Sequence, residues 1–262
     1  MGFSRKERYT VEDLLRLMET LRSRCPWDRE QTHKSIRKNL IEETYEAVEA
    51  IDKGDAQLLK EELGDVLLQV VFHTQIEKES GNFDFGDVCD NICKKLITRH
   101  PHVFGDTRAA DAEQALKGWD EIKKAEKQSQ TITGSLETVP RALPALMRSQ
   151  KVQQRAGKAG FDYPGADMAM TDLRSEVEEL ETALRSGNHE ALEEELGDLI
   201  FSAVNVSRFA GVDAEEALTK SCDKFIGRFF KVEELASKKG IDMQKSSIKV
   251  LDGLWKEAKI IK

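Results

Sequence analysis

Several features that mark other protein classes are scarce in this 262-residue sequence. It has four cysteines, and none forms a Cys-x-x-Cys pair or the His/Cys spacing of a zinc site. We therefore expect reduced thiols and a cytoplasmic protein. No run of about eighteen uncharged apolar residues occurs, and no apolar run follows the first ten residues. The sequence predicts neither a membrane span nor a signal peptide, and hence no membrane partner.

An excess of basic charge is also missing. The chain has 40 Lys and Arg against 48 Asp and Glu, a formal net charge of −8. Binding to a nucleic-acid backbone depends on clustered basic residues, so we expect no nucleic-acid partner. An anionic ligand would need a metal ion to help neutralise it.

Strand-type alternation of Val, Ile and Thr is scarce, whereas apolar residues recur at helical spacing. The helical pattern covers residues 10–26, 28–54, 55–81 and 84–100. Gly54 followed by Asp55 fits a tight turn that would place the second and third runs antiparallel. The sequence predicts an all-α protein.

The chain repeats itself at an offset of 133 residues, so that the run Glu61 to Asp65 recurs as Glu194 to Asp198. After this motif the offset falls to 129, which we attribute to four extra residues in a loop of the first copy. The repeat predicts two tandem helical domains, because each half has an ordinary domain size. We expect an N-terminal domain over 1–128, a linker over 129–142 and a C-terminal domain over 143–262.

Both copies carry two pairs of carboxylates, each pair on one predicted helix face. The first set is Glu43, Glu46, Glu62 and Asp65, and the second is Glu176, Glu179, Glu195 and Asp198. Residues three apart on a helix are neighbours, so the four carboxylates of a set converge if the two helices pack together. Such a group is unstable without a cation, and ligands that are all oxygens favour Mg²⁺, with Mn²⁺ as a substitute.

Simpler interpretations compete with this metal site. Glutamate-rich helix faces are often only solvated, although the repetition of both pairs argues against that here. A di-iron site would need Glu-x-x-His, which neither Glu62 nor Glu195 provides. Gly64 and Gly197 lie inside the motif helices at a cost of about 1 kcal/mol relative to alanine. Their recurrence predicts close helix packing or the approach of a ligand.

Basic and aromatic residues recur as well. Lys95 with Arg99, and Lys224 with Arg228, are spaced i, i+4 and fit either phosphate binding or a salt-bridged helix face. Each copy ends in a Trp-x-x-x-Lys pair that could stack on a base and reach a phosphate, or else pack in a core or a dimer interface: Trp119 with Lys123, and Trp255 with Lys259. Trp27, ahead of the first motif, is a candidate for a base pocket or a loop anchor.

Taken together, these motifs resemble the MazG nucleoside triphosphate pyrophosphohydrolases. The resemblance is carried by Cys25-Pro-Trp-Asp, the Glu-Glu-x-Tyr-Glu of residues 42–46, Glu-Leu-Gly-Asp at 62–65, Arg99-His-Pro-His-Val-Phe, Leu143-Pro-Ala-Leu-Met and Gly160-Phe-Asp, and it covers nearly the whole chain. It implies tandem all-α MazG domains in a homodimer that converts a nucleoside triphosphate to the monophosphate and pyrophosphate with Mg²⁺. By this likeness the eight repeated carboxylates are metal ligands, the two Lys/Arg pairs bind phosphates and Trp255 binds the nucleotide.

The second copy departs from the motif where Ser175 replaces the leading carboxylate, Glu42. We expect a water activated by metal and a glutamate to attack the α-phosphorus, a position taken from the family likeness, with Glu42, Glu43 and Glu176 as catalytic candidates. The second site would then lack one helper. An alternative function is a helical dimerisation or regulatory module in which one or both metal sites are structural or vestigial.

Overall fold

A computed structural model describes residues 5–125 and 131–260. At positions 120, 121, 123–125 and 132 it describes the backbone but not the side chain. Within these ranges every regular element is a helix, which confirms the all-α prediction. The chain divides into two compact units, 1–128 and 129–262, each of which is described by itself.

The first unit begins with capped helices at the predicted places. Its helices are α1 (Val11–Arg24), α2 (Pro26–Glu30), α3 (His33–Lys53), α4 (Ala56–Glu79), α5 (Phe85–Arg99), α6 (Pro101–Phe104) and α7 (Ala112–Ala125). Thr10 and Asp84 form capping boxes at α1 and α5. The run expected over 28–54 is broken, because α2 ends at Glu30 and Thr32 caps a new helix with Ser35.

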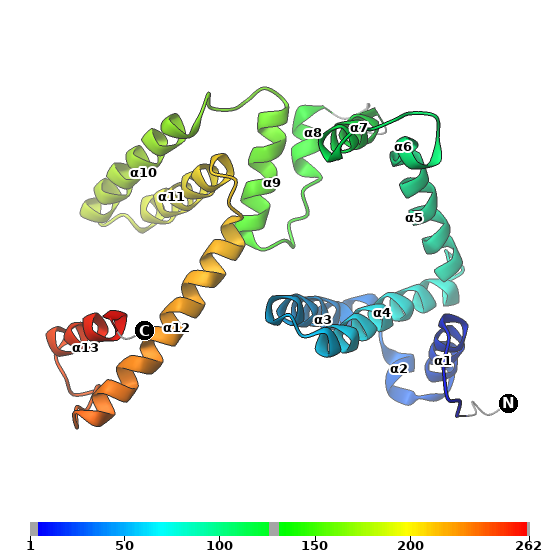
Figure 1. Cartoon of the computed structure of the whole chain (residues 1–262), viewed down its shortest axis with the longest axis horizontal. Coiled ribbons are helices and arrows are strands. Elements are labelled where there is room, and N and C mark those ends of the chain that lie inside the picture. The colour runs from blue at the N-terminus through cyan, green and yellow to red at the C-terminus, as the bar shows by residue number, and fades with distance from the viewer. Residues whose placement is uncertain (1–4, 126–130, 261–262) are drawn as a thin grey trace. The chain divides into compact units, whose positions relative to one another are not determined.

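Helices α3 and α4 form an antiparallel pair (Figure 1). Gly54 has the positive φ of 65° that the turn requires, and the Asp55 carboxylate then caps α4. Helix α1 covers this pair through a small core in which Met18, Val71 and Phe72 are buried. The pair places the motif residues of α3 opposite those of α4.

The second unit repeats this pair. Its helices are α8 (Ile132–Glu137), α9 (Ala145–Lys158), α10 (Ala166–Ser186), α11 (His189–Phe209), α12 (Ala214–Lys238) and α13 (Ile248–Ile260). α10 and α11 begin 133 residues after α3 and α4, and α12 begins 129 residues after α5. We expected the four extra residues of the first copy to lie in a loop, but most of them lie in a helix. Three of the four extend α4, which has 24 residues against 21 in α11, and one lengthens the following loop.

Part of the predicted linker is folded into the second unit. Helix α8 lies against α9, where Arg155 donates hydrogen bonds to the carbonyl of Ser135 and to the hydroxyl of Thr138. Val139 is buried. Residues 131–139 therefore pack against α9 as part of the second unit.

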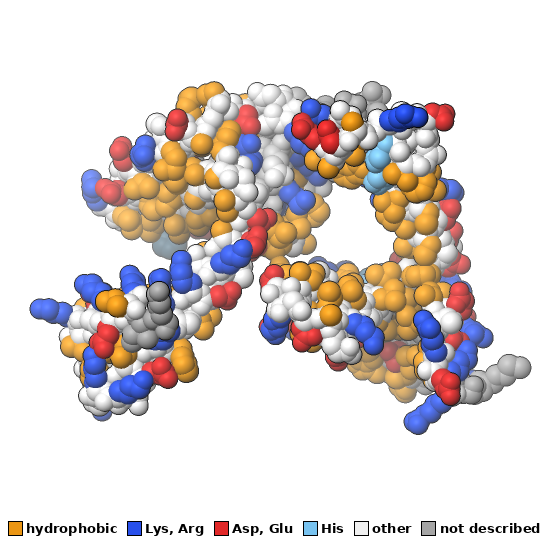
Figure 2. All heavy atoms as spheres, in the orientation of Figure 1, with side chains coloured by type: hydrophobic (Ala, Val, Ile, Leu, Met, Phe, Trp, Pro, Cys, Tyr) orange, Lys and Arg blue, Asp and Glu red, His pale blue; other side chains and the backbone are white. Residues whose placement is uncertain are grey.

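The helices expose an unusual amount of apolar surface. The accessible area is 19354 Å², whereas two separate globular proteins of half this mass would together expose about 14,000 Å². Apolar side chains gather over the helix pairs of both units (Figure 2). Exposed examples are Ile41, Tyr45 and Val48 on α3, with Phe225 and Phe230 on α12. Among the described residues no helix is long and apolar enough to cross a membrane.

Candidate metal and nucleotide sites

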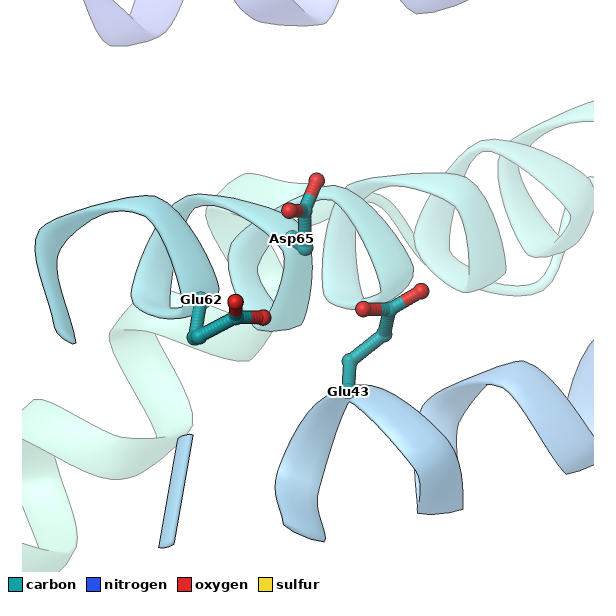
Figure 3. Close-up of side chains that lie close together, drawn as sticks. All are labelled: Glu43, Glu62 and Asp65. Atoms are coloured by element: carbon teal, nitrogen blue, oxygen red, sulfur yellow. The ribbon is translucent and has the colours of Figure 1, made fainter. Parts of the chain in front are cut away.

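In the first unit, three of the predicted ligands meet between α3 and α4. Glu43 from α3 points toward Glu62 and Asp65 from α4 (Figure 3). One oxygen from each carboxylate lies within 4.8 Å of the others, and all three side chains are partly buried. The i, i+3 spacing and the antiparallel pair together produce this convergence.

Burial and mutual repulsion raise the pKa values of two carboxyl groups in this cluster. The pKa of Glu43 is raised by burial and then by Asp65 and Glu46, and the pKa of Glu62 is raised by burial and then by Glu46 and Asp65. Glu46 therefore lies beside the cluster, although its oxygens are outside the closest group. A bound cation would relieve this repulsion, so the donor set fits Mg²⁺.

The second unit assembles a different three of its four predicted ligands. Oxygens of Glu176, Glu179 and Glu195 lie within 4.8 Å of one another, and Asp198 lies outside this group. The pKa of Glu176 is raised by burial, then by Glu179, with a smaller effect of Asp198. The hydroxyl of Ser175 donates a hydrogen bond of 3.0 Å to Glu179. Where the first copy has the carboxylate of Glu42, the second copy therefore has a hydroxyl that donates to the predicted ligand Glu179.

An additional carboxylate adjoins the second cluster. Asp172, one turn before Glu176, accepts hydrogen bonds from the hydroxyls of Tyr163 at 2.8 Å and Ser202 at 2.7 Å. It also contributes to the raised pKa of Glu176. The sequence motifs did not single out Asp172. The available signal was that the repeat aligns it with Asn39, so that an aspartate in the second copy replaces an amide in the first.

The predicted phosphate-binding pair of the first unit lies on α5. This helix leaves the C-terminal end of α4, whereas Glu62 and Asp65 are in the N-terminal half of α4 (Figure 1). The guanidinium of Arg99 lies 5.4 Å from the ring centre of Trp119, a cation–π contact, and Lys95 lines a surface depression with Phe83 and Ile92. Within this unit the structure places Arg99 against Trp119.

In the second unit Trp255 belongs to a core between α12 and α13. Its ring centre is 5.0 Å from that of Phe225, and it packs against the buried cluster that includes Val232 and Leu254. The ammonium of Lys259 lies 5.9 Å from the Trp255 ring centre, so the second Trp-x-x-x-Lys pair is in contact. Lys224 and Arg228 lie on α12 without such an aromatic partner in the described contacts. The side chain of Lys123 lies outside the described part of the chain.

Comparisons with known proteins identify the family. The profile of the MazG nucleotide pyrophosphohydrolase domain matches residues 31–104 and 166–232. The nucleoside triphosphate pyrophosphohydrolase/pyrophosphatase MazG of Thermotoga maritima is 45% identical over 95% of this chain and 95% of its own. The nucleoside triphosphate pyrophosphohydrolase of Escherichia coli K12 is 40% identical over 95% of this chain and 97% of its own. This chain belongs to the MazG family. YabN of Bacillus subtilis, an uncharacterised protein, is 43% identical over 90% of this chain and 48% of its own length.

Each MazG match contains one carboxylate cluster and the glycine beside it. A Cβ atom added to Gly64 or Gly197 would have no neighbour within 4 Å. The expected close helix packing at these glycines is therefore wrong, and the approach of a ligand stays a prediction. Space is open on this side of both motif helices.

The leading carboxylate of the first MazG motif is engaged elsewhere. Glu42 is exposed and forms an ion pair of 2.9 Å with Lys38 on the surface of α3. The closest metal-binding group in this unit contains Glu43 but not Glu42. The catalytic role of Glu42 stays a prediction.

Trp27 precedes the first MazG match and is 59% exposed. Its helix, α2, is held by Arg22, a buried residue that sequence reasoning missed. The Arg22 guanidinium donates to Glu79 and to three backbone carbonyls, those of Asp28, Arg29 and Gln31. This anchor fixes the segment while leaving the indole in solvent.

Proposed function

We propose that this MazG protein is an Mg²⁺-dependent nucleoside triphosphate pyrophosphohydrolase that produces a nucleoside monophosphate and pyrophosphate. The observation that carries the proposal is the doubled carboxylate cluster, which recurs at equivalent places in both units. The names of the relatives from Thermotoga maritima and Escherichia coli support the activity. A role in nucleotide-pool housekeeping or stress-related nucleotide control follows from this chemistry, and we place it in the cytoplasm.

The cluster residues would hold the cation and water. Glu43, Glu62 and Asp65 in the first unit, and Glu176, Glu179 and Glu195 in the second, already present oxygens to a common point. Glu46 and Asp198 each raise the pKa of a neighbouring ligand, and we assign them to complete the two sets. Bound Mg²⁺ would supply charge neutralisation and acidify a water.

The remaining residues would orient the substrate. A cluster carboxylate accepts a proton from the attacking water, while basic side chains offset charge on the departing pyrophosphate. We assign this second task to Lys95, Arg99, Lys224 and Arg228. Trp27, Trp119 and Trp255, with Lys123 and Lys259, are assigned to binding the base and phosphates.

A homodimer is part of the proposal. The total accessible area of 19354 Å² exceeds the area of about 14,000 Å² for two isolated globular domains, and large apolar side chains are among the exposed residues. Association of two copies would cover apolar faces such as that of Ile41, Tyr45 and Val48 on α3. Sedimentation velocity should therefore report a dimer.

The activity is tested with purified protein, Mg²⁺ and a panel of nucleoside triphosphates. We expect pyrophosphate as the direct product, and orthophosphate as the sole direct product would contradict the proposal. Two matched double variants show which unit catalyses the reaction, because each disables one cluster. They are Glu62→Gln with Asp65→Asn, and Glu195→Gln with Asp198→Asn. Combining both pairs should lower turnover by a factor of at least about 10³. Activity that survives the combination would rule out catalysis at these clusters.

A further inference from the structure

A second line of polar groups extends the metal cluster along α4. Gln69, His73 and Glu77 follow Asp65 at intervals of four residues and therefore share its helix face. His33, the first residue of α3, meets this line from the opposite helix. Its Nδ1 lies 2.7 Å from Nδ1 of His73, and its Nε2 lies 2.6 Å from Oε1 of Glu77.

The contact between His33 and His73 is edge to edge. The two ring planes are within 8° of parallel, and the ring centres are 5.0 Å apart. With the two Nδ1 atoms at 2.7 Å, a centre separation this long requires both centres and both nitrogens to lie nearly on one line. The two imidazoles are thus coplanar and joined by one N–H···N hydrogen bond.

The position of each proton follows from Glu77. Hydrogen bonds from Asn82 and His33 lower the pKa of Glu77, so its carboxylate is ionised and only accepts. Nε2 of His33 must then carry a hydrogen. In the neutral ring Nδ1 of His33 is the acceptor, and Nδ1–H of His73 donates to it. Burial and then His33 lower the pKa of His73, which is therefore neutral, with a bare Nε2.

Two acceptors at the inner end of this chain have no partner. Nε2 of His73 and Oε1 of Gln69 are both buried without a hydrogen bond among the described residues. Buried polar atoms are seldom left unsatisfied, and these two lie one helical turn apart. One molecule with two donor hydrogens would satisfy both, and water is such a molecule.

We propose that Gln69 and His73 bind a water molecule and that His73 and His33 pass protons from it to Glu77 and on to solvent. The inference rests on the proposed function, because attack of water on a phosphate at the first cluster releases a proton one turn away, beside Asp65. The bound water takes up the proton released at the cluster, by way of the carboxylate that first accepts it, and gives one of its own to Nε2 of His73, whose Nδ1 proton moves to Nδ1 of His33. The Nε2 proton of His33 then moves to the Glu77 carboxylate, which releases it. Each imidazole gains one proton and loses one, so no other reactant is needed, and both rings return to their starting tautomers by proton exchange with solvent before the next turnover.

The second unit has no equivalent chain. At the offset of 133, His33, Gln69, His73 and Glu77 correspond to Ala166, Ser202, Val206 and Ala210. Ser202 instead donates to Asp172. The relay therefore belongs to the first cluster alone.

A first test does not depend on activity. In ¹⁵N-histidine NMR spectra of the full-length protein, His73 should appear as the Nδ1–H tautomer and His33 as the Nε2–H tautomer. A crystal structure should show an ordered water within hydrogen-bond distance of Gln69 and His73. An Nε2–H tautomer at His73, or no water there, would overturn the proposal.

A second test isolates the first unit kinetically in a Glu195→Gln, Asp198→Asn background. There His73→Gln should lower kcat about 10- to 100-fold without changing KM, and added imidazole should restore much of the loss. Gln69→Leu, which removes a water ligand but keeps both histidines, should lower kcat in the same direction. His189→Gln, at an exposed position on α11, is the matched control.

The outcomes separate this proposal from the proposed function. An unchanged kcat in the two variants, or a loss that imidazole does not rescue, overturns the relay. The relay is also overturned if the wild type releases pyrophosphate but the Glu195→Gln, Asp198→Asn variant has no turnover. The first cluster would then catalyse no reaction that releases a proton. Absence of pyrophosphate release from the wild type would contradict the function itself.

Discussion

The two units use the same helix pair but anchor the segment before it in different ways. In the first unit Arg22 of α1 donates to the carbonyls of that segment and to Glu79. In the second unit Arg208 of α11 donates to the Asp162 carboxylate, and its guanidinium also lies over Phe209. The first anchor is an arginine that donates to three backbone carbonyls as well as to a carboxylate, and the second is a side-chain ion pair of similar exposure.

Both anchors leave an aromatic residue in solvent just before an Asp. Trp27 precedes Asp28 in the first unit, and Phe161, which is 85% exposed, precedes Asp162 in the second. The duplicated scaffold has thus kept the placement of this segment while the contacts that hold it have changed. Equivalent positions in a repeat do not imply equivalent energies.

The interior of the helix pair also differs between the units. Asn39 and Gln69 lie where the second unit has Asp172 and Ser202, and the latter two are joined by a hydrogen bond. A carboxyl side chain therefore adjoins the second cluster, and an amide takes its place in the first. We expect the two clusters to respond differently to pH and Mg²⁺.

The largest difference should appear when the anchors are removed. Arg22→Met keeps packing over Phe72 but leaves Glu79 and three carbonyls without their donor, and should destabilise the first unit by about 3 kcal/mol. Arg208→Met should cost the second unit about 1 kcal/mol, because the Arg208 guanidinium donates to side chains and its loss leaves no backbone carbonyl without a donor. Urea unfolding followed by tryptophan fluorescence can separate the units, since Trp27 and Trp119 report on the first and Trp255 on the second. Equal losses would contradict the proposed difference between the anchors.

A smaller difference should appear in the pH dependence of stability without metal. The pKa values of Glu43, Glu62, Glu176 and Glu195 are all raised in the folded state. The folded protein then binds more protons at these groups, so their contribution to stability is greatest at low pH and falls as pH rises above about 4.3, the unfolded value. Mg²⁺ should reduce this loss. The measurement is chemical unfolding from pH 4.5 to 8 in EDTA and in Mg²⁺.

Exchange of the residues that differ between the units makes this test specific. Asp172→Asn should weaken the pH dependence of the second unit, and Asn39→Asp should strengthen that of the first. If neither substitution changes the pH profile, Asp172 does not influence the second cluster as its effect on the pKa of Glu176 indicates.

Local patterns predicted much of this structure. Thr10, Asp84 and the turn at Gly54 and Asp55 were predictable because capping and positive-φ turns depend on residues close in sequence. The paired cluster residues were predictable for the same reason, together with the antiparallel pairing that a short turn imposes. The repeat then extended each prediction to the second unit.

What the sequence did not reveal depends on contacts between distant residues. Arg22 meets Glu79 across 57 positions, and His33 meets His73 across 40. Neither pair has a fixed spacing or a counterpart in the other copy, so neither pattern nor repetition indicated it. Which three ligands come together in each cluster also depends on side-chain rotamers, and these are set by neighbours such as Ser175.

The smallest expected effect concerns the leading position of the motif. Glu42→Ser in the first unit and Ser175→Glu in the second exchange the two residues, each measured in a background where the other cluster is disabled. Because Glu42 is exposed and paired with Lys38, we expect pyrophosphate release to change less than about tenfold, well below the effect of losing a general base. Ser175→Ala, which removes the hydrogen bond to Glu179 without adding charge, is the control for the second unit. A loss of 10²-fold or more in Glu42→Ser would instead make Glu42 the base of the first site, and the Ser175 replacement would then be sufficient to make the two sites unequal.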